Sequence, residues 1–294
     1  MGYLYLAGAL AACAVKGFCG KKQSAFVSGV RDAALVNLLR LLCCAAVGAV
    51  LLALGDGFGA LAVGKGAMAV TVLSGAANAV MLITWLLAVK RSAYMLLDVF
   101  ATLGVIVPML VCRFLYGEAI RPVQWAGFAL LCAAVLVMCS YSMKIKGKRM
   151  TAADILLLTV FGISCGTADL TQKLFVHSAP DGSKAAFNFY TFAFAAAILA
   201  VLLCFLWGKE KAPCPLGKVW YYIVIMALAL FITSYGKTAA AAILPAVQVY
   251  PLFQGGILIL ASLMAAVFFG EKLTKQSVLG IAMCFGALLI INML

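Results

Sequence analysis

The sequence predicts an all-α integral membrane protein with ten transmembrane helices, arranged as two inverted five-helix repeats. Hydrophobic residues make up 66% of the chain and charged residues only 11%, whereas soluble domains have roughly half and a quarter. Ten apolar segments come close to the length of about 20 residues that a spanning helix needs. A short motif also recurs at an offset close to half of the 294 residues.

The ten apolar segments are separated by short connections, as in a compact helical bundle. They fall at about 2–20, 33–54, 67–88, 93–112, 122–142, 152–174, 186–207, 218–236, 243–269 and 276–293. The first segment lacks the positively charged region that precedes the core of a signal peptide, so we expect it to remain as the first span.

A Gly-Glu pair ends the fourth and ninth apolar segments, in FLYGEAIRPVQWAG (114–127) and VFFGEKLTKQSVLG (267–280). An offset of 153 residues relates Gly117, Glu118 and Gly127 to Gly270, Glu271 and Gly280. Glycine suits the left-handed residue that ends many helices, and a carboxylate suits the free N–H groups of the next helix. We therefore expect the Gly-Glu pairs to form tight hairpins, with a gating contact as the alternative. Pro122 fits the first turn of the following helix, and Gly127 and Gly280 permit close helix approach.

The basic stretch SMKIKGKRM at 142–150 lies between the two copies of the motif. We interpret 1–142 as the first five-helix repeat, 143–151 as a basic linker and 152–294 as the second five-helix repeat. Because five is an odd number of spans, the second repeat must enter the membrane from the opposite face. Inverted repeats suit alternating access, in which a site at the pseudo-symmetry axis opens to one face and then to the other.

Lysine and arginine are distributed unevenly among the connections between spans. The odd-numbered connections hold 15 of them and the even-numbered connections hold 6. The positive-inside rule then places the odd connections in the cytoplasm and both termini outside, in a multi-pass protein of the cytoplasmic membrane.

The net charge of +13 lies between the apolar runs, so it indicates membrane orientation and not a nucleic-acid-binding domain. Eleven cysteines lie mostly inside apolar runs, form no Cys-x-x-Cys pair and accompany a single histidine, His177. This pattern favours cysteine as apolar filler, and we expect no metal site and no cofactor. The expected partners are a small-molecule substrate and membrane lipid, and the chain suits a monomer or a homodimer.

Ionisable side chains inside the apolar runs are functional candidates, because a charge at mid-bilayer costs roughly 2.5–3.5 kcal/mol on insertion scales. Asp98 is a candidate for proton titration or cation contact, and pairing with Lys90 or Arg91 two turns away is the alternative. Asp169 and Lys173 are four residues apart, so they share a helix face and can neutralise each other. Lys173 can also attract an anionic group or snorkel to the interface.

Polar and aromatic residues in the apolar segments predict a site with an aromatic wall, a few amides and one or two charges, suited to an amphipathic metabolite. The predicted substrate-binding residues are Asn78, Trp85, Tyr94, Asp98, Asp169, Gln172, Lys173, Tyr235, Lys237, Gln248 and Tyr250. Helix packing or an interfacial position is the alternative for each of them. For Arg40, which follows Asn37 by almost one turn, we expect snorkelling or pairing within the bundle rather than substrate contact.

Proline and glycine mark the spans that we expect to move. Pro245 and Pro251 interrupt backbone hydrogen bonding in the ninth span, which predicts a kinked, mobile helix lining a cavity. The fourth span carries Gly104 and Pro108, so the two spans match as a gating pair would. The segment GISCG at 162–166 predicts a small-residue packing face in the sixth span.

Ten spans, two five-helix halves and a Gly-Glu hairpin after spans four and nine resemble the drug/metabolite transporter superfamily, in its EamA-type branch. The stretches ANAVMLITWLLAVKRSAYMLLDVFATLGVIVP (77–108) and GKTAAAAILPAVQVYPLFQGGILILASLMAAVFFGEKLT (236–274) are similar to that family's third-to-fourth and eighth-to-ninth spans. The resemblance covers essentially the whole chain. It implies secondary active transport, generally export, of amino acids, metabolites or drugs through a cavity lined by spans 1, 3, 4, 6, 8 and 9. Family members usually have cytoplasmic termini, opposite to the charge count, and we take the charge count as the prediction.

These features predict a secondary active transporter that moves a small organic solute across the cytoplasmic membrane, with a proton as a candidate coupling ion. A membrane scaffold or assembly factor, or a lipid-linked-substrate translocase, is the alternative. A membrane enzyme would need a nucleophile, an acid–base pair or a metal cluster near an interface. With one histidine, no paired acids and no Gly-rich phosphate loop, the chain is not expected to be an enzyme.

Overall fold

The fold is built from helices, which a computed structural model describes over residues 1–92, 94–116, 121–146, 149–206, 216–244, 246–270 and 274–292. Four predicted gating or structural positions, Gly117, Glu118, Pro245 and Glu271, lie outside these residues, as does 147–148 of the predicted linker. The helices are α1 (Gly2–Gln23), η1 (Ser24–Phe26), α2 (Val30–Leu54), η2 (Phe58–Leu61), α3 (Lys65–Arg91), α4 (Tyr94–Leu103), α5 (Ile106–Tyr116), α6 (Pro122–Lys146), α7 (Ala152–Ser178), α8 (Lys184–Leu206), α9 (Leu216–Ile243), α10 (Ala246–Phe269) and α11 (Lys275–Asn292).

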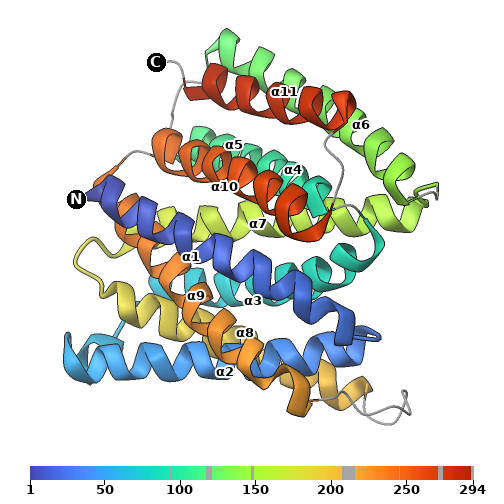
Figure 1. Cartoon of the computed structure of the whole chain (residues 1–294). Coiled ribbons are helices and arrows are strands. Elements are labelled where there is room, and N and C mark those ends of the chain that lie inside the picture. Colours follow the sequence, from blue (N-terminus) through green and yellow to red (C-terminus); the bar gives the residue numbers. More distant parts are fainter. Residues whose placement is uncertain are drawn as a thin grey trace. The chain divides into compact units, whose positions relative to one another are not determined.

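Each predicted apolar segment forms helix in the part of the chain that the structure describes (Figure 1). Nine stretches among the described residues are long and apolar enough to cross a bilayer, and the tenth segment, Lys275–Ile291, is a shorter apolar helix. The predicted fold class, an all-α integral membrane protein, is confirmed. Helices satisfy every interior backbone group within the segment itself, which is what a lipid environment requires.

The fourth predicted span is made of two helices among the residues that the structure describes. The chain leaves α4 at Leu103, turns through Gly104 and Val105, and resumes as α5 at Ile106. Pro108 lies in the first turn of α5, where its missing N–H has no intrahelical partner to lose. By contrast, α10 continues as one helix through Pro251. The predicted kink and mobility of the ninth span stay a prediction.

Two predicted helix-end devices are confirmed. Gly270 follows the last residue of α10 with φ = 63°, the left-handed conformation expected of a glycine that ends a helix. Pro122 is the first residue of α6, where its fixed φ favours helix initiation.

The described residues form two compact units, and each unit combines segments from both predicted repeats. Unit 1 consists of Met1–Leu87 and Thr171–Ile243, and unit 2 consists of Ala88–Leu170 and Leu244–Leu294. The boundary between them falls inside α3 and inside α7, so both helices contribute residues to each unit. The predicted repeats, 1–142 and 152–294, are defined by sequence correspondence and not by this division into units.

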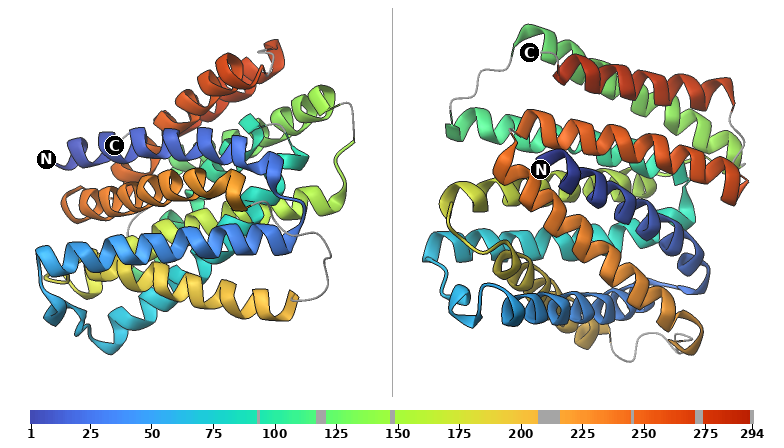
Figure 2. Two further views of the ribbon diagram at one scale, coloured as in Figure 1. Left: turned by 60° about the horizontal axis from the view of Figure 1, so that its bottom comes forward. Right: turned by 60° about the vertical axis from the view of Figure 1, so that its left-hand side comes forward.

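In unit 1, α1 packs along α9, and α2 packs between α8 and α9 (Figures 1 and 2). Leu41 and Cys44 of α2, Phe192 and Leu199 of α8 and Phe231 of α9 are among the side chains of its main hydrophobic cluster. In unit 2, α6 packs along α11, and α4 contacts both α6 and α10. Each unit therefore has its own packed interior.

Helices at corresponding places of the two predicted repeats pack against one another, and they do so antiparallel. The second span meets the seventh (α2 on α8), the fourth meets the ninth (α4 on α10), and the fifth meets the tenth (α6 on α11). Gly48, late in α2, lies against Phe189, early in α8. Tyr94 at the start of α4 packs on Phe269 at the end of α10, with ring centroids 5.5 Å apart. Antiparallel counterparts are what an inverted repeat requires.

The offset of 153 residues recurs in the contacts between α6 and α11. A Cβ added to Gly127 would come within 2.7 Å of Ile291 Cγ1, and one added to Gly280 would come within 2.6 Å of Met138 Cγ. Subtracting 153 from 291 gives 138, so each glycine faces the counterpart of the residue that the other faces. Such reciprocity characterises an interface with two-fold symmetry. The predicted close approach at both glycines is confirmed.

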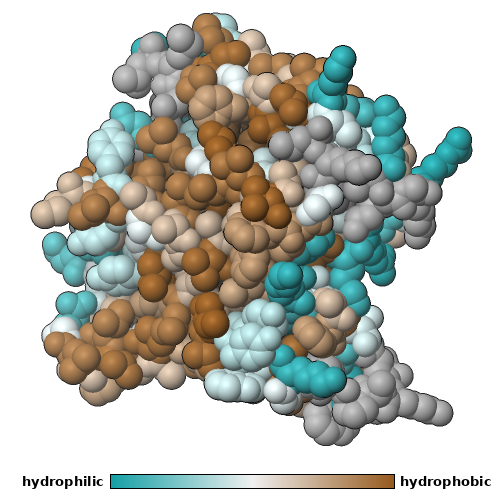
Figure 3. Space-filling view, in the orientation of Figure 1, coloured by the Kyte–Doolittle hydropathy of each residue, from teal (hydrophilic) through white to brown (hydrophobic). Residues whose placement is uncertain are grey.

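The surface of the described residues is rich in large hydrophobic side chains, which cover much of the face drawn in Figure 3. Leu136, Phe205 and Val267 are 71–73% exposed, and many other leucines, valines and phenylalanines are more than 40% exposed. Apolar exposure on this scale would be an aggregation hazard in water, but it is the expected surface for contact with lipid tails.

Substituting leucine at Gly127 or at Gly280 is expected to destabilise the protein by about 1–3 kcal/mol, because each new side chain would overpack the contact between α6 and α11. Thermal unfolding in detergent should show a lower midpoint for both variants. Gly286→Leu is the matched control, since an added Cβ there meets nothing within 4 Å. Equal midpoints for all three variants would contradict the close approach of these helices.

Candidate functional site

The predicted substrate-binding residues divide between the two units. Unit 1 holds Asn78, Trp85, Gln172, Lys173, Tyr235 and Lys237. Unit 2 holds Tyr94, Asp98, Asp169, Gln248 and Tyr250. They come from spans three, four, six, eight and nine, and their role in substrate binding stays a prediction.

Unit 2 joins two of its predicted residues directly. The side chain of Tyr250 on α10 is 1% exposed, and its hydroxyl donates a hydrogen bond of 2.7 Å to the backbone carbonyl of Asp169 on α7. Asp169 is itself only 2% exposed. This bond joins the ninth span to the sixth. Both of its residues belong to the predicted substrate-binding set.

Asp98 lies in the middle of α4 and is half-buried. Its backbone carbonyl accepts a hydrogen bond of 2.7 Å from the Thr102 hydroxyl, one turn further along the helix. Tyr94 lies one turn before Asp98 and is buried against Phe269. The carboxyl group therefore sits on a helix whose neighbouring turns are fixed by packing, which is how a protein holds an ionisable group in place.

The glycines of α7 bring it against the fourth span at backbone distance. A Cβ added to Gly162 would meet the Phe100 carbonyl oxygen, and one added to Gly166 would meet the Gly104 carbonyl oxygen. A Cβ added to Gly104 would in turn meet the Gly162 carbonyl oxygen. The small-residue packing face predicted at 162–166 is confirmed, and the break in the fourth span lies within it.

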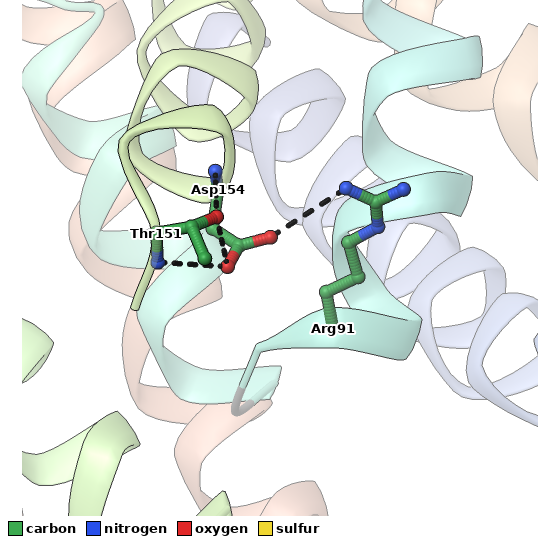
Figure 4. Close-up of polar contacts among 3 residues, drawn as sticks. All are labelled: Arg91, Thr151 and Asp154. Carbon is green, nitrogen blue, oxygen red and sulfur yellow. Dashed lines mark hydrogen bonds and ion pairs between the residues drawn. The ribbon is translucent and has the colours of Figure 1, made fainter. Parts of the chain in front are cut away.

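Arg91 does pair with an acid, but its partner is Asp154. The two side chains join the last residue of α3 to the first turn of α7, with Arg91 Nη1 3.6 Å from Asp154 Oδ1 (Figure 4). Asp154 also accepts hydrogen bonds from the backbone N–H and the hydroxyl of Thr151, at 3.0 and 2.8 Å. The cation lies at a helix C-terminus and the carboxylate at a helix N-terminus, as both helix dipoles favour. Lys90 remains the predicted alternative partner of Asp98.

In unit 1, Lys173 is half-buried and its ammonium group lies 3.5 Å from the carbonyl oxygen of Ala241, in the last turn of α9. Free carbonyl groups at a helix C-terminus favour a cation. The neighbouring Gln172 is 4% exposed, and its Oε1 has no hydrogen-bond donor. Asn78 is 7% exposed and donates to the Ser74 carbonyl at 2.9 Å. The predicted neutralisation of Lys173 by Asp169 stays a prediction.

Tyr235 lines a pocket of about 580 Å³ in unit 1, between the connections that follow α2 and α7. The other polar side chains that line it are those of Asp56, Asp181, Ser183 and Lys184. The Tyr235 ring stacks on Phe231, with centroids 6.1 Å apart and an angle of 17° between the planes. Lys237, two residues further along α9, is half-buried. The aspartates belong to connections, where sequence reasoning about spans had no reason to look.

Several buried polar residues of unit 1 are absent from the predicted set. Gln23, Asn37, Asn188 and Thr191 are each at most 1% exposed, and each has a side-chain polar atom without a hydrogen-bond partner. Arg40 belongs with them, since it is 1% exposed. A signal was present in the sequence: Asn37 with Arg40, and Asn188 with Thr191, are polar pairs three residues apart inside apolar runs.

Comparison with known proteins points to one family. Residues 153–293 match the EamA-like transporter family, over almost the whole of the predicted second repeat. The resemblance noted in the sequence is thereby confirmed over this part of the chain. Together with the long apolar helices, the match indicates a multi-pass membrane transporter of the drug/metabolite type.

Solved structures share the fold of this chain. Twenty-eight chains match its structure. One of them, described only as "Crystal structure of protein", has a TM-score of 0.69 and 18% sequence identity, with 98% of this chain and 96% of that chain covered. Among curated proteins, none matches.

Replacing Tyr250 by phenylalanine is expected to lower the free energy of unfolding by about 1 kcal/mol, because the hydrogen bond to the Asp169 carbonyl is lost inside the membrane. The measurement is the midpoint of thermal unfolding in detergent. Tyr5→Phe serves as the control, since Tyr5 is 44% exposed. An unchanged midpoint for Tyr250→Phe would show that this bond does not hold α10 to α7.

Proposed function

We propose that this protein is a secondary active transporter that exports a small organic solute across the cytoplasmic membrane by alternating access. The observation that carries the proposal is the reciprocal packing of Gly127 and Gly280, which two halves related by a two-fold operation would produce. In transporters built from inverted repeats, near-equivalent halves exchange roles as the site opens to each face in turn.

Polar residues inside the spans support transport over a scaffolding role. Asp98 lies in the middle of α4, Asp169 is buried in α7, and Lys173 lies one turn after Asp169. A scaffold has no need of ionisable groups at these depths, where they are costly and mark substrate or ion pathways by default. The match of residues 153–293 to a transporter family points the same way and away from an enzyme.

The two carboxyl groups also suggest how transport is driven. A carboxyl group inside a membrane protein can bind a proton from one face and release it to the other, which couples solute movement to the proton gradient. We assign this role to Asp98 first, because it is only half-buried and a proton can reach it more easily than Asp169.

Asp98→Asn and Lys173→Ala are each expected to slow solute movement at least tenfold, equivalent to about 1.4 kcal/mol, because one removes the titrating group and the other removes a cation. Transport would be measured in proteoliposomes, with a solute found by comparing metabolite pools of cells with and without the protein. Lys275→Ala is the control, since Lys275 is exposed at the start of α11. Undiminished transport by both variants would remove these residues from the mechanism.

Both termini are expected on the outer face of the membrane, because the connections that carry 15 of the lysines and arginines alternate with those that carry 6. A reporter active only outside the cytoplasm, fused after Leu294, should therefore be active. Fusions in the connections after α1 and after α2 provide internal references of opposite orientation. An inactive C-terminal reporter, with an active one after α1, would place the termini in the cytoplasm.

A further inference from the structure

Arg40 is the largest side chain that is fully buried among the described residues, and it lies in the third turn of α2. Its guanidinium Nη2 donates to Gln23 Oε1 at 2.7 Å and contacts Met226 Sδ at 3.3 Å. Both partners are neutral, and no carboxylate of the described residues pairs with the group. An arginine buried without an opposite charge is strongly disfavoured, and in a membrane it marks a functional site by default.

Two hydrogen-bond donors are left over at this place. Arg40 Nε and Gln23 Nε2 are both buried without an acceptor. They belong to side chains that already touch each other, because Gln23 Oε1 accepts from Arg40. Neighbouring N–H donors beside a positive charge match two oxygens of one carboxylate or phosphate group, the geometry at which arginine binds most strongly.

The charges around Arg40 favour an incoming anion. The closest acid along α2, Asp32, is two turns away and accepts a hydrogen bond of 2.9 Å from the Ser28 N–H. The other charged residues at this end of α1 and α2 are the cations Lys16, Lys21, Lys22 and Arg31. With Arg40 included, these segments carry five cations and one acid here.

An apolar wall adjoins the donors. Met226, which contacts Arg40, also lies against Gly20: a Cβ added there would be 2.8 Å from Met226 Cε and 2.7 Å from Trp85 Cζ3. Trp85 is one of the residues that the sequence assigned to substrate binding. A thioether and an indole ring beside a guanidinium suit a solute with an anionic end and an apolar body.

We propose that Arg40 and Gln23 bind the carboxylate or phosphate oxygens of a small organic anion, with Trp85 and Met226 against its apolar part. That this anion is the transported solute rests on the function proposed above, whereas the binding site itself does not. The site is occluded, because Arg40 is 1% exposed, so an anion reaches it when Met226 or Trp85 moves aside. Arg40 contacts Gln23 and Met226 within the bundle, as one of the two sequence-based expectations had it, but these partners leave its charge uncompensated.

The test is anion-dependent stability of the full chain in phosphatidylcholine nanodiscs. Benzoate, succinate and inorganic phosphate are compared with benzamide and succinamide at equal concentration, because a ligand that binds the folded state raises the unfolding midpoint. At least one anion should raise the midpoint by several degrees while its amide does not. Arg121→Met, which removes an exposed arginine, should keep the rise, and Arg40→Met should lose it.

The variants also separate binding from a structural role. Without anion, Arg40→Met should unfold at the same temperature as the parent or higher, because an apolar side chain replaces an uncompensated charge. Arg40→Lys keeps the charge without the planar fork, and it should weaken anion affinity at least tenfold. An Arg40→Met protein that does not fold, or a parent whose midpoint responds to none of the anions, would overturn the proposal.

A lipid headgroup is the other source of anionic oxygens. If phosphatidylglycerol raised the midpoint in an Arg40-dependent way and no free anion did, the site would be for lipid and the proposal would fail. Proteoliposomes separate this inference from the proposed function. An Arg40-dependent anion response without solute transport would contradict the proposed function and leave the site. Solute transport without any Arg40-dependent anion response would contradict the site and leave the function.

Discussion

Close approach of helix backbones is the constraint on which the structure depends. In a bilayer, apolar side chains gain little by exchanging lipid for one another, so helices are held by dense packing and by polar contacts. Glycine supplies the packing at two crossings, α6 with α11 through Gly127 and Gly280, and α7 with the fourth span through Gly104 and Gly166. The large hydrophobic side chains that a soluble protein would bury are free to face lipid instead.

Polar contacts differ between the two units. In unit 2, Tyr250 is bonded to Asp169, and Asp154 is bonded to Thr151 and Arg91, so the buried or half-buried groups are tied to one another. In unit 1, six buried polar side chains, among them Gln172 and Asn188, keep an atom without a partner among the described residues. Such atoms are costly unless a ligand or water completes them. Unit 1 therefore has more buried polar atoms without a hydrogen-bond partner than unit 2 has among the described residues.

The sequence predicts the fold well because a long apolar segment in lipid must satisfy its own backbone hydrogen bonds, which a helix does. The same holds for Gly127, Gly270 and Pro122, whose roles follow from local backbone chemistry. The break of the fourth span at Gly104 was less predictable, since Pro251 lies within a helix that stays unbroken. The backbone packed against each segment decides whether its helix breaks. The sequence of a single segment does not reveal that neighbour.

The candidate site was predictable only in part. Hydropathy identifies a charged residue inside a span, but it does not say which partners the residue meets. Arg40 was therefore assigned to the bundle, and Gln23, at the end of the first span, was not considered. Asn188 and Thr191 were hidden by the strongly apolar residues around them. Partners that lie 17 and 186 residues away from Arg40 become visible only when the helices are packed.

The reciprocal contacts of α6 and α11 have a mechanical consequence. Along α6, Gly127 and Met138 both touch α11, and they lie eleven residues or about 16 Å apart. Two helices held in contact at two well-separated points cannot rotate across each other. Helices held at a single contact can rotate about that contact. The offset of 153 residues relates the second contact to the first, so the recurrence of the glycine motif also makes this crossing rigid.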